Sequence, residues 1–284
     1  MRLGFAITPA TMDRAAEFKA AGINEAELCL FASRDSVEQA LEDGGRVWDA
    51  LTDADIDVWS THLPTGGMWD ICSLDEDMRR RNVQNLMHVM RAAAGWGSKI
   101  VVVHGLEGHG DDAHLQKIID ACRRSLDEMS TFAARCGMRV AVENMPRSPL
   151  EKSGEILKLM DCCAGLCFDV NHLLLQSHEE FLDDLEKYVI TTHLSDYDAG
   201  RTSCNPKMAP GVLENDTIQF FSGKLGERHW KPGEEGGIVP WETVCRRLIK
   251  AGYRGPWMFE VSMKEYLYTA QEVVDSFLKC SRLG

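Results

Sequence analysis

The sequence has no long apolar run and no surplus of basic residues, and both absences limit what the protein can be. No stretch approaches the roughly 20 apolar residues of a membrane-spanning helix, and the start, MRLGFAITPA, leads into Thr11 without a signal-peptide core. Lys and Arg number 31 against 44 Asp and Glu, so the formal net charge is -13. This charge repels nucleic-acid phosphates and anionic lipids. We therefore expect a cytoplasmic protein with neither a nucleic-acid partner nor a membrane partner.

Cysteine is present without the spacing of a zinc finger or a disulfide framework. The 10 cysteines are scattered over 284 residues, and none forms a CxxC pair. Several lie inside apolar periodic segments, which is typical of small core residues in a reducing compartment. Since no sustained Gly-, Ser- or Pro-rich linker divides the chain, a single domain over residues 1–284 is expected.

Short apolar runs of β-strand character alternate with amphipathic helical segments along the chain. The helical pattern is clearest at 74–94, at 112–135 and from Val239 to Gly252. Strands are predicted at 3–7, 27–30, 58–62, 100–104, 139–143, 166–169, 190–194 and 257–260. Eight strands alternating with helices predict an α/β fold, a (β/α)8 TIM barrel, and not a doubly wound sheet.

One connection, at about 197–238, is much longer than the roughly two to six residues usual between a strand and the next helix. It includes the segment RTSCNPKMAPG. A long loop at the carboxyl ends of barrel strands is predicted to be a lid or a specificity element. A contact between subunits is the alternative interpretation.

Six of the predicted strands end in a side chain that can bind a metal ion. These residues are His62, His104, Glu143, Asp169, His193 and Glu260. Because the carboxyl ends of barrel strands meet at one mouth, the six side chains are predicted to converge there. Carboxylates gathered in an apolar-walled pocket repel one another unless a cation compensates their charge. The pattern therefore predicts a metal site.

The predicted metal ligands are Glu143, Asp169, His193 and Glu260. Three carboxylates and one imidazole suit a hard or borderline divalent ion. We expect one such ion, with Mn2+ as the first choice and Mg2+, Co2+ or Zn2+ as alternatives.

Further residues near the same mouth are predicted to contact a substrate. His172 lies three positions after Asp169, in a turn, where it either supports a metal ligand or meets a substrate hydroxyl. His62 and His104 are interpreted as substrate contacts. Trp69 is either an aromatic wall against a sugar ring or a residue packed under its loop. The remaining histidines outside the motifs are interpreted as solvated or packed: His88, His109, His114 and His178.

The ordered motifs HLP, VVHG, VEN, FDVNH, HLSD, RHWKPGEEGGIVPW and FE resemble those of the sugar phosphate isomerase/epimerase superfamily, which has a xylose isomerase-like barrel. The resemblance covers nearly the whole chain. The likeness to the ketose 3-epimerases and inosose isomerases of this group implies that one divalent metal ion binds to Glu143, Asp169, His193 and Glu260. It also implies that the two glutamates transfer protons. It further implies a small sugar or cyclitol substrate and a homo-oligomer, either a dimer or a tetramer.

The implied reaction is proton abstraction next to a carbonyl, through an enediolate that the metal stabilises. If Glu143 and Glu260 flank the substrate on opposite faces, removal of the proton by one and its return to the same carbon by the other gives epimerisation. Return of the proton to the neighbouring carbon gives isomerisation. Loss of a β leaving group would instead make the enzyme a keto-sugar or keto-glycoside lyase or dehydratase. His229 and the glycines after it are predicted to help hold the substrate. Without a phosphate cradle at a helix start, an unphosphorylated substrate is favoured.

Two other classes stay open. Endonuclease IV-like members of the superfamily hold three zinc ions and cut at abasic sites, and this sequence supplies most of the larger ligand set. It departs at Glu227-Arg228-His229, where those members have Asp-x-His, and its acidity disfavours DNA binding. The second alternative is a non-catalytic sugar-binding barrel.

Overall fold

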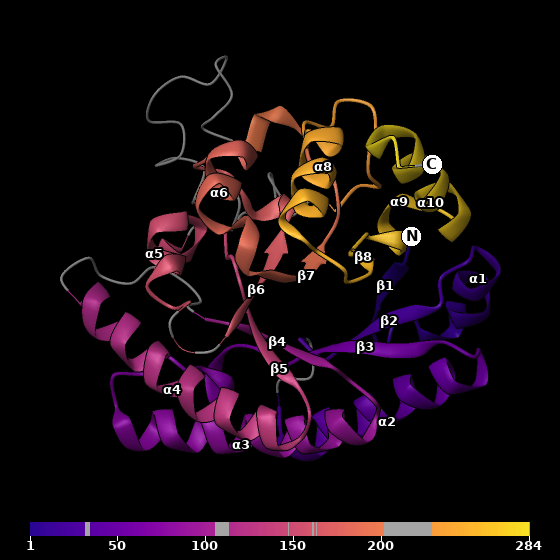
Figure 1. Cartoon of the computed structure of the whole chain (residues 1–284). Coiled ribbons are helices and arrows are strands. Elements are labelled where there is room, and N and C mark those ends of the chain that lie inside the picture. The colour runs from indigo at the N-terminus through magenta and orange to yellow at the C-terminus, as the bar shows by residue number, and fades with distance from the viewer. Residues whose placement is uncertain are drawn as a thin grey trace.

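Eight parallel strands form a barrel in the computed structural model of the chain, which describes residues 1–31, 35–105, 114–146, 148–160, 162, 164–201 and 229–283. The strand order is β7-β6-β5-β4-β3-β2-β1-β8, and Figure 1 shows the helices arranged around these strands. The strands are β1 (Leu3–Ile7), β2 (Glu25–Cys29), β3 (Asp57–His62), β4 (Ile100–His104), β5 (Arg139–Glu143), β6 (Gly165–Asp169), β7 (Val189–His193) and β8 (Trp257–Phe259).

The barrel closes between β7 and β8 at the carboxyl ends of these two strands. A parallel bridge joins Leu194 to Phe259, and the Leu194 N–H donates to the Met258 carbonyl at 2.8 Å. The Glu260 N–H donates a second hydrogen bond, to the Leu194 carbonyl at 3.1 Å. The (β/α)8 TIM barrel predicted from the sequence is therefore confirmed.

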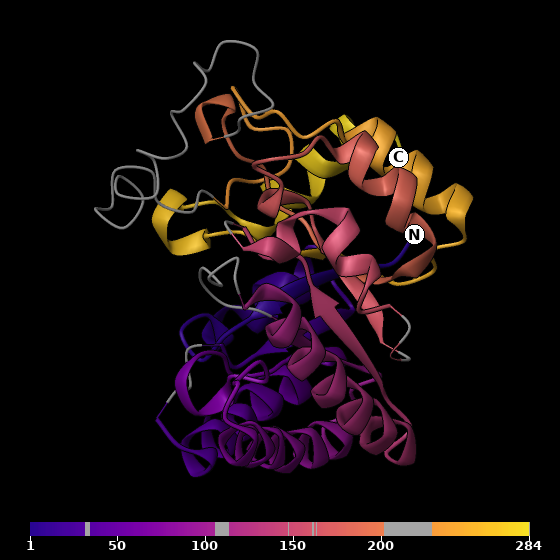
Figure 2. The same cartoon turned by 90° about the vertical axis from the view of Figure 1, so that its left-hand side faces the viewer.

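Helices follow the strands on the outside of the barrel (Figures 1 and 2). The described helices are α1 (Ala15–Ala20), α2 (Val37–Asp53), α3 (Glu76–Gly95), α4 (Leu115–Arg135), α5 (Ser153–Leu157), α6 (His178–Leu185), α8 (Trp241–Ala251), α9 (Met263–Tyr266) and α10 (Ala270–Ser281). In the described part of the chain, no helix combines the length and the apolarity that a membrane crossing requires.

Local signals fix the ends of the predicted helices. The helix predicted at 74–94 begins at Glu76, because the Asp75 side chain caps it by accepting from the N–H groups of Asp77 and Met78. The helix predicted at 112–135 is α4, and residues 112 and 113 lie outside the described residues. Helix α8 ends at Ala251, and Gly252 caps it with a φ of 94°, which suits a residue without a β-carbon.

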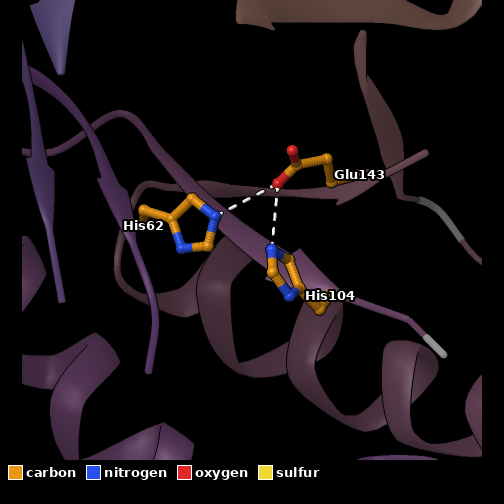
Figure 3. Close-up of side chains that lie close together, drawn as sticks. All are labelled: His62, His104 and Glu143. Carbon is orange, nitrogen blue, oxygen red and sulfur yellow. Dashed lines mark hydrogen bonds and ion pairs between the residues drawn. The ribbon is translucent and has the colours of Figure 1, made fainter. Parts of the chain in front are cut away.

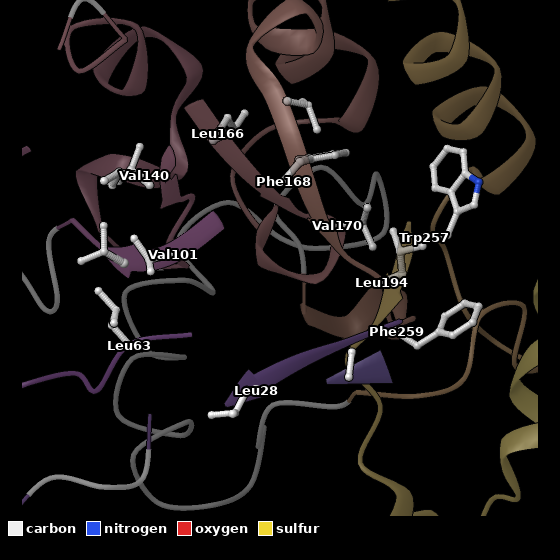
Figure 4. Close-up of a cluster of buried hydrophobic side chains, with 14 of the residues drawn as sticks. Leu28, Leu63, Val101, Val140, Leu166, Phe168, Val170, Leu194, Trp257 and Phe259 are labelled. Atoms are coloured by element: carbon white, nitrogen blue, oxygen red, sulfur yellow. The ribbon is translucent and has the colours of Figure 1, made fainter. Parts of the chain in front are cut away.

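The strands are buried on both faces, and the two faces serve different purposes. Side chains such as Leu28, Val101, Val140 and Phe168 belong to the large apolar core in which strands and helices pack (Figure 4). A second, smaller cluster consists of Ile100, Val102, Ala141 and Cys167. Because side chains alternate along a strand, each residue two positions beyond Val102, Ala141 and Cys167 shares their face. Those residues are His104, Glu143 and Asp169.

Strand β2 differs most from its predicted bounds, and part of one predicted loop falls outside the described residues. Strand β2 runs over Glu25–Cys29 and not over 27–30, because its pairing with β1 begins opposite Gly4. The centre of the predicted loop at 197–238, residues 202–228, lies outside the described residues.

Candidate metal centre and substrate cavity

The six polar residues predicted at strand ends meet at one mouth of the barrel. Five of them are the last residues of consecutive strands β3 to β7, and the sixth directly follows β8. They are His62, His104, Glu143, Asp169, His193 and Glu260. Parallel barrel strands place their carboxyl ends together, which accounts for this convergence of residues that are distant in sequence.

Four of these residues form a compact cluster of potential ligands. One ligand atom from each of Glu143, Asp169, His193 and Glu260 lies within 4.8 Å of all the others. His193 Nδ1 is 3.2 Å from Glu143 Oε1, 3.0 Å from Glu260 Oε2 and 3.8 Å from Asp169 Oδ2. The structure thus brings together the four residues that the sequence predicts as metal ligands.

Two oxygens of this cluster lack the hydrogen bonds that buried carboxylates normally need. Asp169 Oδ2 and Glu260 Oε2 are buried, and neither accepts a well-directed hydrogen bond from the described residues. A buried anionic oxygen in this state is costly unless a cation compensates it. The donor set, three carboxylates and one imidazole, is one that divalent ions such as Mn2+, Mg2+, Co2+ and Zn2+ accept. The residues therefore fit a divalent metal ion.

Burial and mutual charge shift the pKa values of the cluster in different directions. Burial raises the pKa of Asp169 to about 6, and the negative charges of Glu260 and Glu143 add to this rise, while His172 opposes it. Burial would also raise the pKa of Glu260, but the charge of the neighbouring His193 lowers it to about 2. Near neutral pH the cluster thus retains carboxylates able to bind a cation.

Glu143 is the centre of a second group, shown in Figure 3. His62 Nε2 and His104 Nε2 lie 3.1 and 3.2 Å from its Oε2 atom. His62, His104 and Glu143 form another set whose ligand atoms lie within 4.8 Å of one another. Although burial disfavours the charged form of Glu143, His193 and hydrogen bonds from His104 and His172 hold its pKa well below its usual range. Glu143 therefore joins the two groups.

His172 and His229 stand at the edge of the four-residue cluster. His172 Nε2 is 3.4 Å from Asp169 Oδ2, and its Nδ1 is 2.9 Å from the Asn144 carbonyl. His229 Nδ1 is 3.0 Å from the Glu260 carbonyl oxygen. Both histidines line the same cavity as Glu143 and Glu260.

A cavity of about 750 Å³ opens above the cluster. Its described lining contains neither Lys nor Arg, and its apolar part includes Phe31, Met145 and Val261. The lining is therefore suited to a small polar molecule of low charge, with one aromatic side chain beside it.

Trp69, the predicted aromatic wall, is only 2% exposed and packs in the main apolar core. It lines a smaller pocket of about 170 Å³ that shares Thr65 and His104 with the larger cavity. Phe31 instead faces the main cavity, with its ring 5.6 Å from that of His62. Packing under the loop, the alternative interpretation of Trp69, agrees with this burial.

Sequence reasoning assigned no role to two residues of the site, Phe31 and Glu27. Glu27 is fully buried, and its Oε1 atom lies 2.7 Å from His193 Nε2. Strand alternation offered a signal, because Glu27 shares a face with Cys29 near the end of β2. Phe31 follows β2 with no motif to mark it.

The described ends of the long 197–238 loop are held by one buried carboxylate, Asp196. It accepts hydrogen bonds from the backbone N–H groups of Tyr197, Gly233, Ile238 and Val239 and from the Trp241 indole. This carboxylate thereby fixes the segment that follows His229. Glu227 and Arg228, where the sequence departs from the three-zinc pattern, lie outside the described residues.

Comparisons with known proteins agree with this architecture. A 3-keto-D-glucoside 4-epimerase from E. coli superposes with a TM-score of 0.69 at 15% identity, covering 99% of this chain and 100% of that one. A D-tagatose 3-epimerase-like protein gives 0.67 at 16% identity, over 99% and 98% of the two chains. An IOLI protein with a bound zinc atom gives 0.68 at 16% identity, over 99% and 96%.

These likenesses establish the fold alone, because the sequence identities are only 15–16%. No curated protein sequence matches the chain. The model of one protein family, described as the xylose isomerase-like TIM barrel, matches residues 15–279. With nearly the whole barrel matched, the chain belongs to the xylose isomerase-like TIM barrel family.

Proposed function

We propose that this protein is a divalent-metal-dependent isomerase or epimerase acting on a small sugar or cyclitol. The observation that carries the proposal is the cluster of Glu143, Asp169, His193 and Glu260, whose ligand atoms lie within 4.8 Å of one another beside a cavity of about 750 Å³. Similar folds in a 3-keto-D-glucoside 4-epimerase and a D-tagatose 3-epimerase-like protein support the choice of reaction.

The four clustered residues would hold the metal ion, with Mn2+ as our first choice. When bound, such an ion polarises a carbonyl oxygen and offsets the negative charge that develops when a neighbouring C–H bond loses its proton. Glu143 and Glu260 both line the cavity. Their pKa values are lowered, Glu260 to about 2 and Glu143 well below its usual range, so both carboxylates are ionised at neutral pH and able to accept a proton.

The two glutamates are held differently. Glu143 has His193 and His172 near Oε1 and His62 and His104 near Oε2, so its position is constrained by four imidazoles. Glu260 has its side chain 20% exposed. We assign proton removal and return to these two carboxylates, and their relative position around the bound substrate decides whether the product is an epimer or an isomer.

The other cavity residues would bind and orient the substrate. His172 and His229 line the cavity together with His62 and His104, and they would hydrogen-bond substrate hydroxyls. Lys231, the cation near His229, is paired with Glu234 and lies 4.8 Å from the centre of the Tyr268 ring. Because the described cavity lining contains neither Lys nor Arg, an unphosphorylated substrate is preferred.

Solvent deuterium exchange tests the proposal without requiring the substrate to be known. Keto-sugars and inososes are incubated with the Mn2+-loaded protein in heavy water, and the loss of proton signals next to the carbonyl is followed by NMR. We expect exchange with at least one substrate, its loss after chelation, and its recovery when Mn2+ returns. Elimination products in the same spectra would identify a lyase. Full turnover after exhaustive chelation, or no exchange with any substrate, would contradict the proposal.

One observation favours a second candidate, the endonuclease IV-like activity. Glu143 is shared between the four-residue cluster and the group formed with His62 and His104, an arrangement that could hold more than one ion. Against it stand the formal net charge of -13 and the lack of Lys and Arg in the described cavity lining. A metal content near one ion per chain and no binding of an abasic duplex at low salt would exclude this activity.

A further inference from the structure

A fully buried glutamate lies behind the candidate metal centre. Glu27 comes from the middle of β2 and is 0% exposed. Its Oε1 atom lies 2.7 Å from His193 Nε2, and its Oε2 atom accepts a hydrogen bond from the Ser60 hydroxyl at 2.7 Å. Both carboxylate oxygens are therefore satisfied by partners that are themselves fully buried.

The two ring nitrogens of His193 face different surroundings. Nδ1 points at the cluster, 3.0 Å from Glu260 and 3.2 Å from Glu143, while Nε2 points at Glu27. A neutral imidazole carries its proton on one nitrogen and offers a lone pair on the other. An acceptor at Nε2 therefore decides that Nδ1 is the atom available to a cation.

Three other histidines of the site each have a ring nitrogen beside a backbone carbonyl. His62, His172 and His229 each have Nδ1 beside a backbone carbonyl oxygen, at 2.9, 2.9 and 3.0 Å. A carbonyl fixes the ring without adding a full negative charge. His62, His104 and His172 also contact Glu143, a member of the cluster. His193 differs from these three because its Nε2 atom faces a carboxylate outside the cluster, that of Glu27. A carboxylate both orients a metal-binding imidazole and raises its basicity.

Building on the isomerase or epimerase function proposed above, we propose that Glu27 is a positioning residue for the metal centre. It holds the proton of His193 on Nε2, so that the lone pair of Nδ1 faces the cation, and Ser60 in turn holds Glu27. In the contacts of the described residues, the Glu27 carboxylate meets His193, Ser60 and the Cys29 thiol, and none of the other three predicted ligands. Of these partners, His193 is the one that belongs to the four-residue cluster, so we expect Glu27 to act on the metal centre through His193.

Metal affinity measured by equilibrium dialysis with Mn2+ tests this role independently of activity. For Glu27→Ala, we expect the dissociation constant to rise about 10- to 100-fold. Glu27→Gln keeps an acceptor for His193 and should lose less than about tenfold, because a neutral acceptor orients the ring but raises its basicity less. The matched control is Glu25→Gln on the same strand, where Glu25 pairs with Arg2. Its Mn2+ affinity should equal that of the unaltered protein.

Ring-nitrogen NMR shifts of His193 in the Zn2+-loaded protein give a second readout, which does not depend on whether Glu27→Ala folds. We expect the proton on Nε2 in the unaltered protein and in Glu27→Gln. A proton on Nδ1 in the unaltered protein would overturn the proposal. Dissociation constants of Glu27→Ala and Glu27→Gln that both lie within twofold of the value for the unaltered protein would overturn it as well. If one of these results is found while the unaltered protein still binds Mn2+ and exchanges substrate deuterium, only the role of Glu27 is rejected. No Mn2+ binding at all would reject the proposed function as well.

Discussion

At the scale of single residues, the proposed chemistry depends most directly on the charge of Glu260. Glu260→Gln keeps the shape of the side chain and removes the carboxylate that accepts a proton. We expect deuterium exchange into the substrate to fall at least about 100-fold, because general acid–base groups typically contribute 10²- to 10⁴-fold. The measurement is the exchange rate by NMR at saturating Mn2+, so that weakened metal binding does not mask the effect.

The same substitution at Glu235, an exposed residue of the loop after His229, is the matched control. Glu235→Gln should leave the exchange rate unchanged. An exchange rate in Glu260→Gln within a factor of two of the unaltered protein would remove Glu260 from the proton transfer and leave Glu143 as the sole candidate.

The buried His178 leads us to predict that the free energy of unfolding depends on pH. It is buried, with Nε2 donating to the Val170 carbonyl at 2.9 Å, and burial lowers its pKa to about 4. Between pH 6.5 and 4 the unfolded chain therefore binds a proton at His178 that the folded chain does not. The stabilisation is complete above pH 6.5 and falls as the pH drops, by about 2 kcal/mol at pH 5.

Urea unfolding of the unaltered protein and of His178→Gln at pH 7 and pH 5 measures this effect as a difference. The free energy of unfolding should fall by about 2 kcal/mol more in the unaltered protein than in the variant. His88→Gln, at an exposed position of α3, is the control and should follow the unaltered protein. Equal losses in the unaltered protein and His178→Gln would show that His178 does not titrate in this way.

What sequence alone reveals about residues has a physical limit that Glu143 and Glu27 illustrate. Glu143 stands at the end of an apolar run, so its exceptional position is visible in the sequence. Glu27 lies in the segment NEAEL, where alternating acids have the same pattern as a strand with one solvated face. Only the closed barrel turns that face inward, and only the fold brings His193 within 2.7 Å of Glu27.

At the scale of elements, Asp196 is the residue on which the segment after the long loop depends. Asp196→Asn keeps the volume but turns one acceptor oxygen into a donor facing backbone N–H groups or the Trp241 indole. We expect a loss of about 1–3 kcal/mol in the free energy of unfolding, the range for a buried donor left without an acceptor. Amide hydrogen exchange at Ile238 and Val239 should accelerate more than exchange in the strands.

Asp49→Asn, on the exposed face of α2, is the control and should change neither quantity. Uniform acceleration of exchange over the whole barrel in Asp196→Asn would mean that Asp196 contributes to global stability without specifically holding this segment.

Elements of this fold are predictable where an apolar run is short and flanked by helical periodicity. The strands ending at His104 and Glu143 have the predicted bounds because both runs are almost wholly apolar. The start of β2 was missed because the charged Glu25 pairs with Arg2 at the opposite end of the barrel from the metal centre. The anchoring of the 197–238 loop by Asp196 was equally invisible, since five donors converge there only after folding.

At the scale of the whole molecule, the metal centre links strands from both halves of the chain. Its predicted ligands come from β5, β6, β7 and the residue after β8, and Glu27 extends the connection to β2. Figure 1 labels these strands, from β2 in the indigo N-terminal part of the chain to β8 in its yellow C-terminal part. Metal binding should therefore stabilise the barrel as one cooperative unit and not as a local patch.

Thermal unfolding with and without Mn2+ tests this expectation. At a free Mn2+ concentration about 100 times the dissociation constant, a ligand that binds only the folded state adds about 2.7 kcal/mol. For a domain of this size that corresponds to a rise of roughly 5 °C in Tm. The rise should appear as a shift of one transition, and chelation should reverse it. In Asp169→Asn the response should be largely lost, because a neutral amide replaces a buried oxygen that accepts no hydrogen bond from the described residues. An equal rise in Tm in this variant would place Mn2+ elsewhere on the acidic surface, since the cation would then be stabilising the fold without the four-residue cluster.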